Sequence, residues 1–437
     1  MIQDSTTIRD SFFNCLNALS ETPWLFTSQT NAFSRKRKIS FSDAILSTIC
    51  MQRSSSNTEI LKYFDFNPDA PTQSALIQQR SKLQPQAFEE LFYRFTDTLS
   101  PDSTLKGYRL IAVDGSDIYI PRNPQDTDTY RITDSYGKGF NMLHLNAAYD
   151  LMSNIYTDII IQSVNHINEY LALCDMIDRF AQTHPSEKAL FIADRGYVSF
   201  NVFAHAIENN AFFLIRARDP NARSLLRTLD LPDLPEFDIT FERWLTRRNT
   251  KTIKAQPEIY KPIANRIFDY LELKSSKLYY IGFRIIKLKL PNGEDEYLFT
   301  NLPKDDFSIE EIRDLYNRRW GVETSFRDIK YAAGMLFFHS RKKQLVLQEI
   351  YAKLILYNFS EAITNGIVIN KKDRKYAYSV NFALALSICV ELLRRNKQGH
   401  ELTGFEKLLE RELIPIRPGR SSPRFLRART AVSFLYR

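Results

Sequence analysis

The spacing of apolar residues predicts three kinds of segment along the chain. Up to about residue 100, apolar residues recur at helical spacing, for example over residues 43–51 and 88–99. From Tyr108, short runs of Ile, Val, Phe and Tyr alternate with helical segments, which is typical of an α/β sheet. Residues 218–303 favour β structure, and helical periodicity returns at Ser308. We therefore predict an α/β core with a β-rich insertion and helical flanks, divided as 1–100, 101–217, 218–303, 304–345 and 346–437.

The N-terminal region contains two short predicted helices, over residues 57–64 and 74–83. Thr72 or Ser74 has a suitable side chain for the N-cap of the second helix. Such a pair is either a DNA-binding helix–turn–helix or a pair that only packs together. In the first case the second helix would offer four side chains to base edges or phosphates: Gln78, Gln79, Arg80 and Lys82.

Three continuous apolar runs, at residues 109–114, 189–194 and 212–216, predict central strands that are covered on both faces. Two of them end in an aspartate, Asp114 and Asp194. Ligands and catalytic groups gather at the carboxyl ends of strands in open α/β sheets, so two carboxylates there would suit a metal ion. Strands also end in Asp for reasons of turn geometry. Asp117 is a rival to Asp114, although three positions further along a strand its side chain points to the other face.

Residues 218–303 contain four stretches with β character, at 238–241, 267–273, 278–290 and 297–301. Between the last two stands Asn292-Gly293, a dipeptide that favours the tight turn of a β-hairpin. We therefore predict a β-rich insertion that ends in a hairpin.

Residues 308–334 predict a helix, because Ser308 and Glu311 fit a capping box and Gly334 supplies a stop. At about 100° per residue, four polar side chains of this segment fall within an arc of about 60°. This stripe consists of Tyr316, Arg319, Glu323 and Lys330. It could hold a phosphate beside a metal ion, or it could be the solvated rim of an amphipathic helix.

Basic residues are in excess and are unevenly distributed along the chain. The 59 Lys and Arg residues outnumber 51 Asp and Glu. Some of them fall in three clusters, near residues 35–38, 243–254 and 417–429, which indicates either polyanion binding or solvated surface.

The longest apolar stretch, near residues 382–390, is too short to span a bilayer. The four cysteines are far apart, which argues against a disulfide framework and a zinc site, and charged residues near the N-terminus favour the cytoplasm.

The stripe and the two aspartate strands resemble the DDE transposases of bacterial insertion sequences, in the group-four insertion-sequence branch. That branch has a Tyr-Arg-Glu-Lys signature, and the intervals of two, three and six residues between its members all recur here. Residues 113–115 and 194–197 resemble the two Asp motifs of the family, and residues 298–301 resemble the strand before the signature helix. The similarity covers about residues 108–339, with weaker similarity in both flanks.

The resemblance implies an RNase H-like catalytic core interrupted by a β insertion. It further implies that Asp114, Asp194 and Glu323 bind two Mg²⁺ ions, for which Mn²⁺ can substitute. One ion would activate the attacking water or 3′-hydroxyl while the other stabilises the leaving oxygen, and hard oxygen ligands suit Mg²⁺. The residues implied to hold DNA phosphates are Tyr316, Arg319, Lys330 and Arg195.

One position departs from the pattern of some relatives, which place a Trp just before the strand that resembles residues 298–301 and stack it on a flipped base. This sequence has Tyr297 there, and Trp244 in the insertion is an alternative. Either ring could stack on a base.

By the same resemblance, the protein would be a transposase that binds the terminal inverted repeats of its element, cleaves the DNA at the element ends and joins the 3′ ends to target DNA. It would act as a homodimer in a synaptic complex, in the bacterial cytoplasm and associated with the nucleoid. Two alternatives stay open: a catalytically silent, domesticated DNA-binding protein, and a metal-dependent nuclease of the same fold that cuts without joining.

Overall fold

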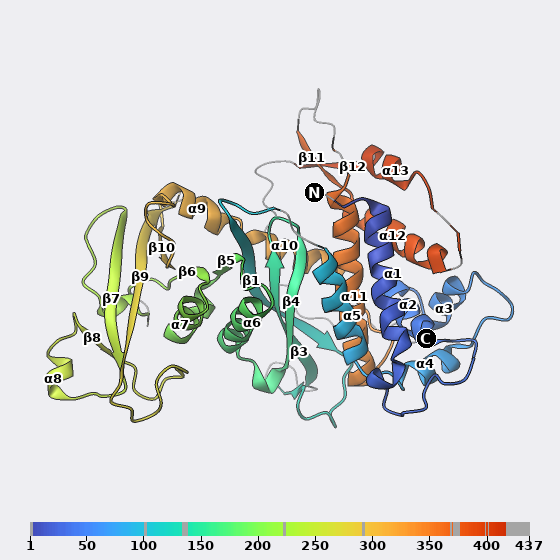
Figure 1. Ribbon diagram of the computed structural model, residues 1–437, viewed down its shortest axis with the longest axis horizontal. Helices are drawn as coiled ribbons and strands as arrows, with labels where there is room; N and C mark the ends of the chain where they lie inside the picture. Colours follow the sequence, from blue (N-terminus) through green and yellow to red (C-terminus); the bar gives the residue numbers. More distant parts are fainter. Residues whose placement is uncertain are drawn as a thin grey trace.

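The computed structural model describes residues 3–99, 103–132, 139–221, 224–290, 293–367, 369, 376–397, 399–400 and 402–416. The molecule is elongated, with a helical body at one end, a helix-covered sheet in the middle and a β insertion at the other end (Figure 1). The basic cluster near residues 417–429 lies outside the described residues, and so does Asn292 of the predicted turn. No helix in the described part of the chain is long and apolar enough to cross a membrane.

The middle of the molecule is a five-stranded mixed sheet with a short extra strand, β2 (Tyr130–Arg131), at one edge. The five strands are β1 (Tyr108–Ile120), β3 (Phe140–Asp150), β4 (Ile155–Ser163), β5 (Lys188–Ala193) and β6 (Phe212–Arg216). They lie in the order β4-β3-β1-β5-β6, with β1, β5 and β6 parallel and β3 antiparallel to both of its neighbours. This is the strand order of an RNase H-like core, and it confirms the predicted fold class.

Helices cover both faces of this sheet, because its strands carry apolar side chains on both sides. On one face, α6 (Glu169–Thr183) and α7 (Phe200–Glu208) pack on residues such as Val113 and Phe191. On the other face, Leu110 and Ile192 pack against α9 (Ile309–Asn317). The predicted continuous apolar runs are therefore central strands.

The insertion extends the core sheet instead of forming a separate one, because β10 pairs antiparallel with β6. The order continues β6-β10-β9-β7-β8. The elements of the insertion are β7 (Phe237–Thr246), α8 (Lys251–Lys254), β8 (Tyr260–Pro262), β9 (Leu278–Lys289) and β10 (Asp295–Thr300). The predicted hairpin is present as the antiparallel pair β9–β10, with Gly293 at a φ of +86°.

The predicted strand over residues 267–273 is wrong, because this segment forms turns without strand pairing. Its backbone carbonyls are bound by a side chain instead of a neighbouring strand: Arg247 donates hydrogen bonds to the carbonyls of Phe268 and Leu271, at 2.9 and 2.6 Å. Arg247 therefore serves the fold of the insertion, although the sequence places it in the second basic cluster.

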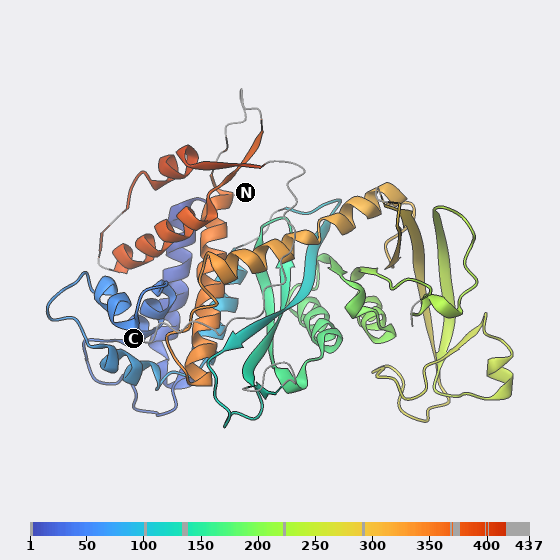
Figure 2. The ribbon, with the colours of Figure 1, turned by 180° about the vertical axis from the view of Figure 1, so that it is seen from behind.

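The N-terminal and C-terminal regions form one helical body around a shared apolar core (Figure 2). The central helix of this body is α11 (Lys343–Asn365), which contacts α1, α2 and α5. The N-terminal helices are α1 (Ser5–Glu21), α2 (Phe41–Cys50), α3 (Ser56–Tyr63), α4 (Gln73–Arg80) and α5 (Gln86–Thr98). The C-terminal elements after α11 are β11 (Ala377–Val380), α12 (Phe382–Lys397), α13 (Phe405–Arg411) and β12 (Leu413–Ile416).

The predicted second helix of the helix–turn–helix is α4, with Thr72 as its N-cap. Two of the side chains expected to reach DNA are buried, because Gln79 is 7% and Arg80 is 1% exposed. Arg80 points into the helical body, where it donates a hydrogen bond to Glu349 of α11 at 3.1 Å. Of the two alternatives, DNA reading is therefore wrong for Gln79 and Arg80, because both side chains are buried in the helical body.

The predicted helix over residues 308–334 is divided into α9 and α10 (Trp320–Tyr331) by a turn at Arg318 and Arg319. Both turn residues keep helical φ and ψ, so the two helices follow each other closely. The predicted capping box at Ser308 and Glu311 is confirmed. At the turn, a Cβ on Gly321 would lie 2.7 Å from Leu151, so glycine allows α10 to approach the β3–β4 connection.

Candidate functional site

Two parallel neighbouring strands bring Asp114 and Asp194 to the same level of the sheet. The expectation that the first strand ends at Asp114 is wrong, because β1 continues to Ile120 in its pairing with β3, whereas β5 ends directly before Asp194. Val113 of β1 is paired with Ala193 of β5, and each aspartate follows directly. The Asp194 side chain caps a short 3₁₀ turn by accepting a hydrogen bond from the backbone N–H of Gly196 at 2.6 Å. The sheet thus brings together two of the three predicted catalytic carboxylates.

Glu323 of α10 belongs to the same site, and Arg319 links it to β1. An Nη atom of Arg319 lies 2.7 Å from the Glu323 carboxylate, and the other Nη lies 3.6 Å from that of Asp114. Burial raises the pKa of Asp114 to about 6; Asp194 and Glu323 act in the same direction, whereas Arg319 opposes it. Asp194 and Glu323 therefore lie close enough to Asp114 to act on it electrostatically.

Two hydrogen-bond donors at the site are buried and unpaired within the described residues: the hydroxyl of Tyr316 and the Nε of Arg319. Burial raises the pKa of Tyr316 to about 12, so its hydroxyl keeps its proton near neutral pH. Unpaired buried donors cost free energy, and a bound acceptor would remove that cost. Such an acceptor can be a phosphate oxygen.

The remaining predicted phosphate ligands lie at the margins of this arrangement. Lys330 is partly buried and donates a hydrogen bond to the Ser116 hydroxyl at 2.6 Å, so it joins α10 to β1. Burial lowers the pKa of Lys330. Arg195 follows Asp194 directly and is exposed. The stripe predicted on one helix therefore spans two helices, and Arg319 and Lys330 contact β1.

Sequence reasoning missed Trp320, which is adjacent to Arg319. Its side chain is 53% exposed, and the Arg319 guanidinium lies 5.2 Å from its ring centroid. A large exposed aromatic ring beside a cation is suited to contact a nucleic acid base. The only signal in the sequence was its position inside the signature.

Sequence reasoning also missed His144 and Glu169, which lie against Gly115, the residue after Asp114. The imidazole of His144 lies between carboxylates, 2.9 Å from Asp117 and 3.1 Å from Glu169. A Cβ added to Gly115 would lie 2.4 Å from His144 and 2.5 Å from Glu169. The glycine after Asp114 is thus needed because these side chains press against the backbone there.

We expect His144 to be positively charged at neutral pH. Burial opposes the charge, but the carboxylates of Asp117 and Glu169 outweigh it and raise the pKa of His144 to about 9. Because the folded pKa exceeds the unfolded value of about 6.5, this charge stabilises the fold fully below pH 6.5, and the contribution is lost as the pH rises through 9. NMR of ¹³C-histidine-labelled protein, with His144→Gln for assignment, would measure the titration. A midpoint below pH 7 would contradict the expectation.

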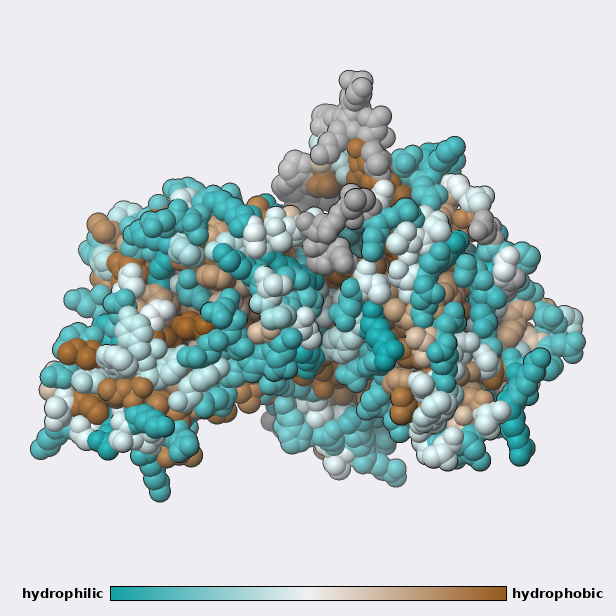
Figure 3. Space-filling view, in the orientation of Figure 1, coloured by the Kyte–Doolittle hydropathy of each residue, from teal (hydrophilic) through white to brown (hydrophobic). Residues whose placement is uncertain are grey.

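The two residues predicted to stack on a base differ in exposure. Tyr297 is only 9% exposed and its ring packs against Phe237, so its burial does not support the stacking role. Trp244 is 41% exposed and forms an edge contact with Tyr280. The insertion exposes other large hydrophobic side chains, and brown surface gathers over this end of the molecule in Figure 3. A stacking role for Trp244 stays a prediction.

The described residues contain no group of three or more His, Cys, Asp or Glu side chains that could hold a metal ion as they stand. Asp114 and Glu323 instead share the guanidinium of Arg319, which neutralises part of their charge. A cation that binds to these two carboxylates would therefore compete with Arg319 for them.

Among known protein families, the model of the transposase DDE domain matches residues 105–359 of the chain. The chain belongs to this family. The match includes the whole core sheet, the insertion and both helices of the signature, and it confirms the prediction of a DDE transposase.

Among solved structures, the chain is similar to a piggyBac transposase in a synaptic complex with hairpin DNA, with a TM-score of 0.49 and 10% sequence identity. The alignment covers 96% of this chain and 87% of that one. A comparison with curated proteins finds no match.

Proposed function

We propose that this DDE transposase family member belongs to the group-four insertion-sequence branch, cuts DNA at the ends of its element and joins the freed 3′ ends to target DNA. The observation that supports this most strongly is that Asp114 and Asp194 follow paired residues of two parallel strands and that Arg319 contacts both Asp114 and Glu323. The intervals of the Tyr-Arg-Glu-Lys signature support the branch.

In this proposal, Asp114, Asp194 and Glu323 bind two Mg²⁺ ions, and Mn²⁺ can replace them. The donor set fits, because carboxylate oxygens are hard ligands, and the negative charges of Asp194 and Glu323 add to burial in raising the pKa of Asp114. The ions would supply an activated hydroxyl and stabilise the leaving oxygen. The protein's own residues would hold and orient the DNA.

Arg319 has a double role in this proposal. Its two Nη atoms contact the carboxylates of Asp114 and Glu323, while its Nε has no partner among the described residues. Binding of a cation by the carboxylates would free the guanidinium for a DNA phosphate, which it can grip by two hydrogen bonds. The Tyr316 hydroxyl would donate to the same backbone, and Lys330 would add a positive charge.

Arg319→Ala is expected to weaken binding of the element-end DNA and to reduce the salt dependence of that binding. Each phosphate contact contributes about 0.9 to the slope of log K against log salt, so the slope should fall by about that amount. Fluorescence anisotropy at several salt concentrations would measure it. Arg327→Ala is the matched control, since Arg327 lies on the same helix with its side chain 68% exposed. An equal change of slope in both variants would count against the phosphate role of Arg319.

Incubation of the protein with DNA that carries the flanking ends of its gene, in Mg²⁺ or in EDTA, tests the function. We expect Mg²⁺-dependent cuts at the element boundary and 3′ ends joined to a target plasmid. Two ends must be brought together, so we also expect a homodimer on paired ends. Cuts without joining would indicate a nuclease, and specific binding without cuts would indicate a silent DNA-binding protein.

A further inference from the structure

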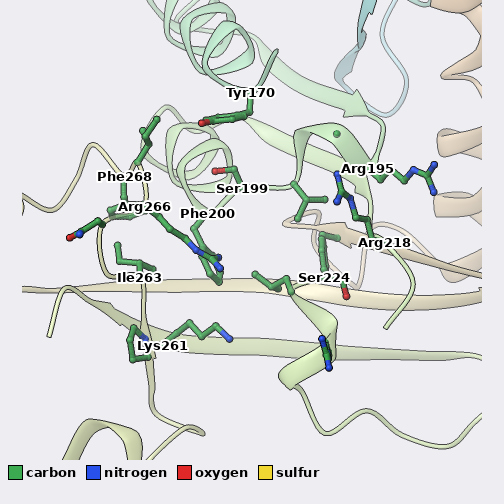
Figure 4. A pocket seen from close by; sticks show the side chains of 18 residues that line it. Tyr170, Arg195, Ser199, Phe200, Arg218, Ser224, Lys261, Ile263, Arg266 and Phe268 are labelled. Carbon is green, nitrogen blue, oxygen red and sulfur yellow. The ribbon is translucent and has the colours of Figure 1, made fainter. Parts of the chain in front are cut away.

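A cavity of about 950 Å³ lies between the RNase H-like core and the insertion, directly beside Asp194. Arg195 and Gly196, the next residues in the chain, form part of its wall. The rest of the wall comes from α7, from the segment after β6 and from the region around β8. In Figure 4, Lys261 and Arg266 extend from the insertion, and Arg218 lies on the other side.

The lining of this cavity is strongly basic, and none of the described residues that line it is acidic. The four lining arginines form no ion pair within the described part of the chain, so their charge is not neutralised by a neighbouring carboxylate. Burial, together with the charges of Arg266 and Arg243, lowers the pKa of Lys261, as expected where positive charges repel one another. The five lining cations are Arg195, Arg218, Arg227, Lys261 and Arg266.

Apolar and aromatic side chains complete the wall. Tyr170, Phe200 and Phe268 contribute rings, and Ile263 adds an aliphatic surface. Phosphates alone would need only the cations, whereas a nucleic acid strand also presents sugars and bases that favour apolar and aromatic contact. The mixed lining therefore fits a nucleic acid strand better than it fits a free inorganic anion.

We propose that this cavity binds a short single-stranded segment of DNA, with its backbone phosphates on the arginines. The inference rests on the proposed function, because the segment would come from the DNA held at Asp114 and Asp194. A cube of this volume has an edge of about 10 Å, which suits a few nucleotides of one strand better than a duplex, whose major groove alone is about 12 Å wide.

Binding of a fluorescent five-nucleotide oligothymidine to the full chain, measured by anisotropy in EDTA, tests the proposal without DNA cleavage. The variant is Arg227→Gln combined with Arg266→Gln, since both side chains are exposed and line the cavity. We expect the affinity for the oligomer to fall more than tenfold. The slope of log K against log salt should fall by about 1.4, because each of the two lost single-strand phosphate contacts contributes about 0.7. The matched control is Arg248→Gln with Lys277→Gln, which removes the same charge from exposed positions of the insertion.

An equal loss of affinity in the control variant would overturn the proposal, because general positive charge would then explain the binding. Displacement of the oligomer by a duplex as readily as by unlabelled single strands would also overturn it. If tripolyphosphate or ATP binds as tightly as the oligomer, the cavity is a site for free phosphates and not for DNA. Photo-crosslinking of a 4-thiothymidine oligomer to peptides that contain Tyr170 or Phe268 would independently support binding of single-stranded DNA in the cavity.

Failure of this proposal can be distinguished from failure of the proposed function. A protein that cuts element ends in Mg²⁺ but binds the oligomer equally well in both double variants keeps its function and loses the cavity assignment. A protein that binds the oligomer through the cavity but never cuts DNA keeps the binding site and loses the catalytic proposal.

Discussion

Glu323→Gln is expected to lower the rate of DNA cleavage by about 10³-fold or more. A metal ion contributes several kcal/mol to the stabilisation of a transition state, and each 1.4 kcal/mol corresponds to about a tenfold change in rate. Glutamine keeps the size of the side chain and an oxygen that can accept the hydrogen bond from Arg319, which is 2.7 Å long with glutamate. Folding and binding of element ends should therefore be largely unchanged. The measurement is single-turnover cleavage of an end-containing DNA in Mg²⁺.

Glu310→Gln is the matched control, because Glu310 is an exposed glutamate of α9 outside the candidate site. It should cleave at the rate of the unmodified protein. Cleavage by the Glu323 variant within tenfold of that rate would contradict the catalytic role. Joint loss of folding and DNA binding would instead show that Glu323 is needed for the structure.

Arg80→Met is expected to destabilise the helical body by about 3–5 kcal/mol, the usual effect of removing one partner from a buried ion pair. Arg80 and Glu349 are 1% and 3% exposed at their side chains, and they join α4 to α11. Burial raises the pKa of Glu349, but Arg80 and the contacts with His339 outweigh burial and lower this pKa to about 2. The carboxylate therefore stays charged. Without Arg80 this charge would be buried with too few partners. The shift of the urea unfolding midpoint, followed by circular dichroism, measures the effect.

Arg94→Met provides the matched control for this prediction. Arg94 pairs with Glu90 on the surface of α5 at 2.6 Å, with side chains 49% and 41% exposed. Exposed helix pairs of this kind contribute only about 0.3–0.5 kcal/mol. Combining Arg80→Met with Glu349→Met should restore part of the lost stability, because the unpaired Glu349 charge is removed, whereas the backbone N–H of His339 loses its acceptor. Equal destabilisation by the Arg80 and Arg94 variants would contradict the importance of burial.

The core of the fold and the catalytic candidates could be predicted because each depends on the residue pattern within one short segment of the sequence. Continuous apolar runs that end in Asp114 and Asp194 identify central strands, and their parallel pairing then places both carboxylates at one edge. The capping box and the polar stripe identify the segment that carries Glu323. None of these features requires knowledge of a distant partner.

Three features that were missed depend on contacts between segments far apart in the sequence. Arg80 looks like a surface arginine until Glu349, 269 positions away, is brought beside it. His144 lies on a strand whose apolar and polar residues alternate irregularly, and only the fold places it between Asp117 and Glu169. Residues 267–273 have β character, but Arg247 supplies their hydrogen bonds in place of a strand. Tertiary contacts override local preference in all three cases.

Mapping of the metal site by iron-dependent cleavage of the protein backbone tests the central claim most directly. Fe²⁺ substituted for Mg²⁺, with ascorbate and peroxide, generates radicals that cut the chain close to the bound ion. We expect cuts near Asp114, Asp194 and Glu323 that excess Mg²⁺ suppresses and that weaken in the Glu323→Gln variant. Cuts elsewhere in the chain, or cuts at these positions that are unchanged by Mg²⁺ and by the substitution, would contradict the assignment of these carboxylates as the metal site.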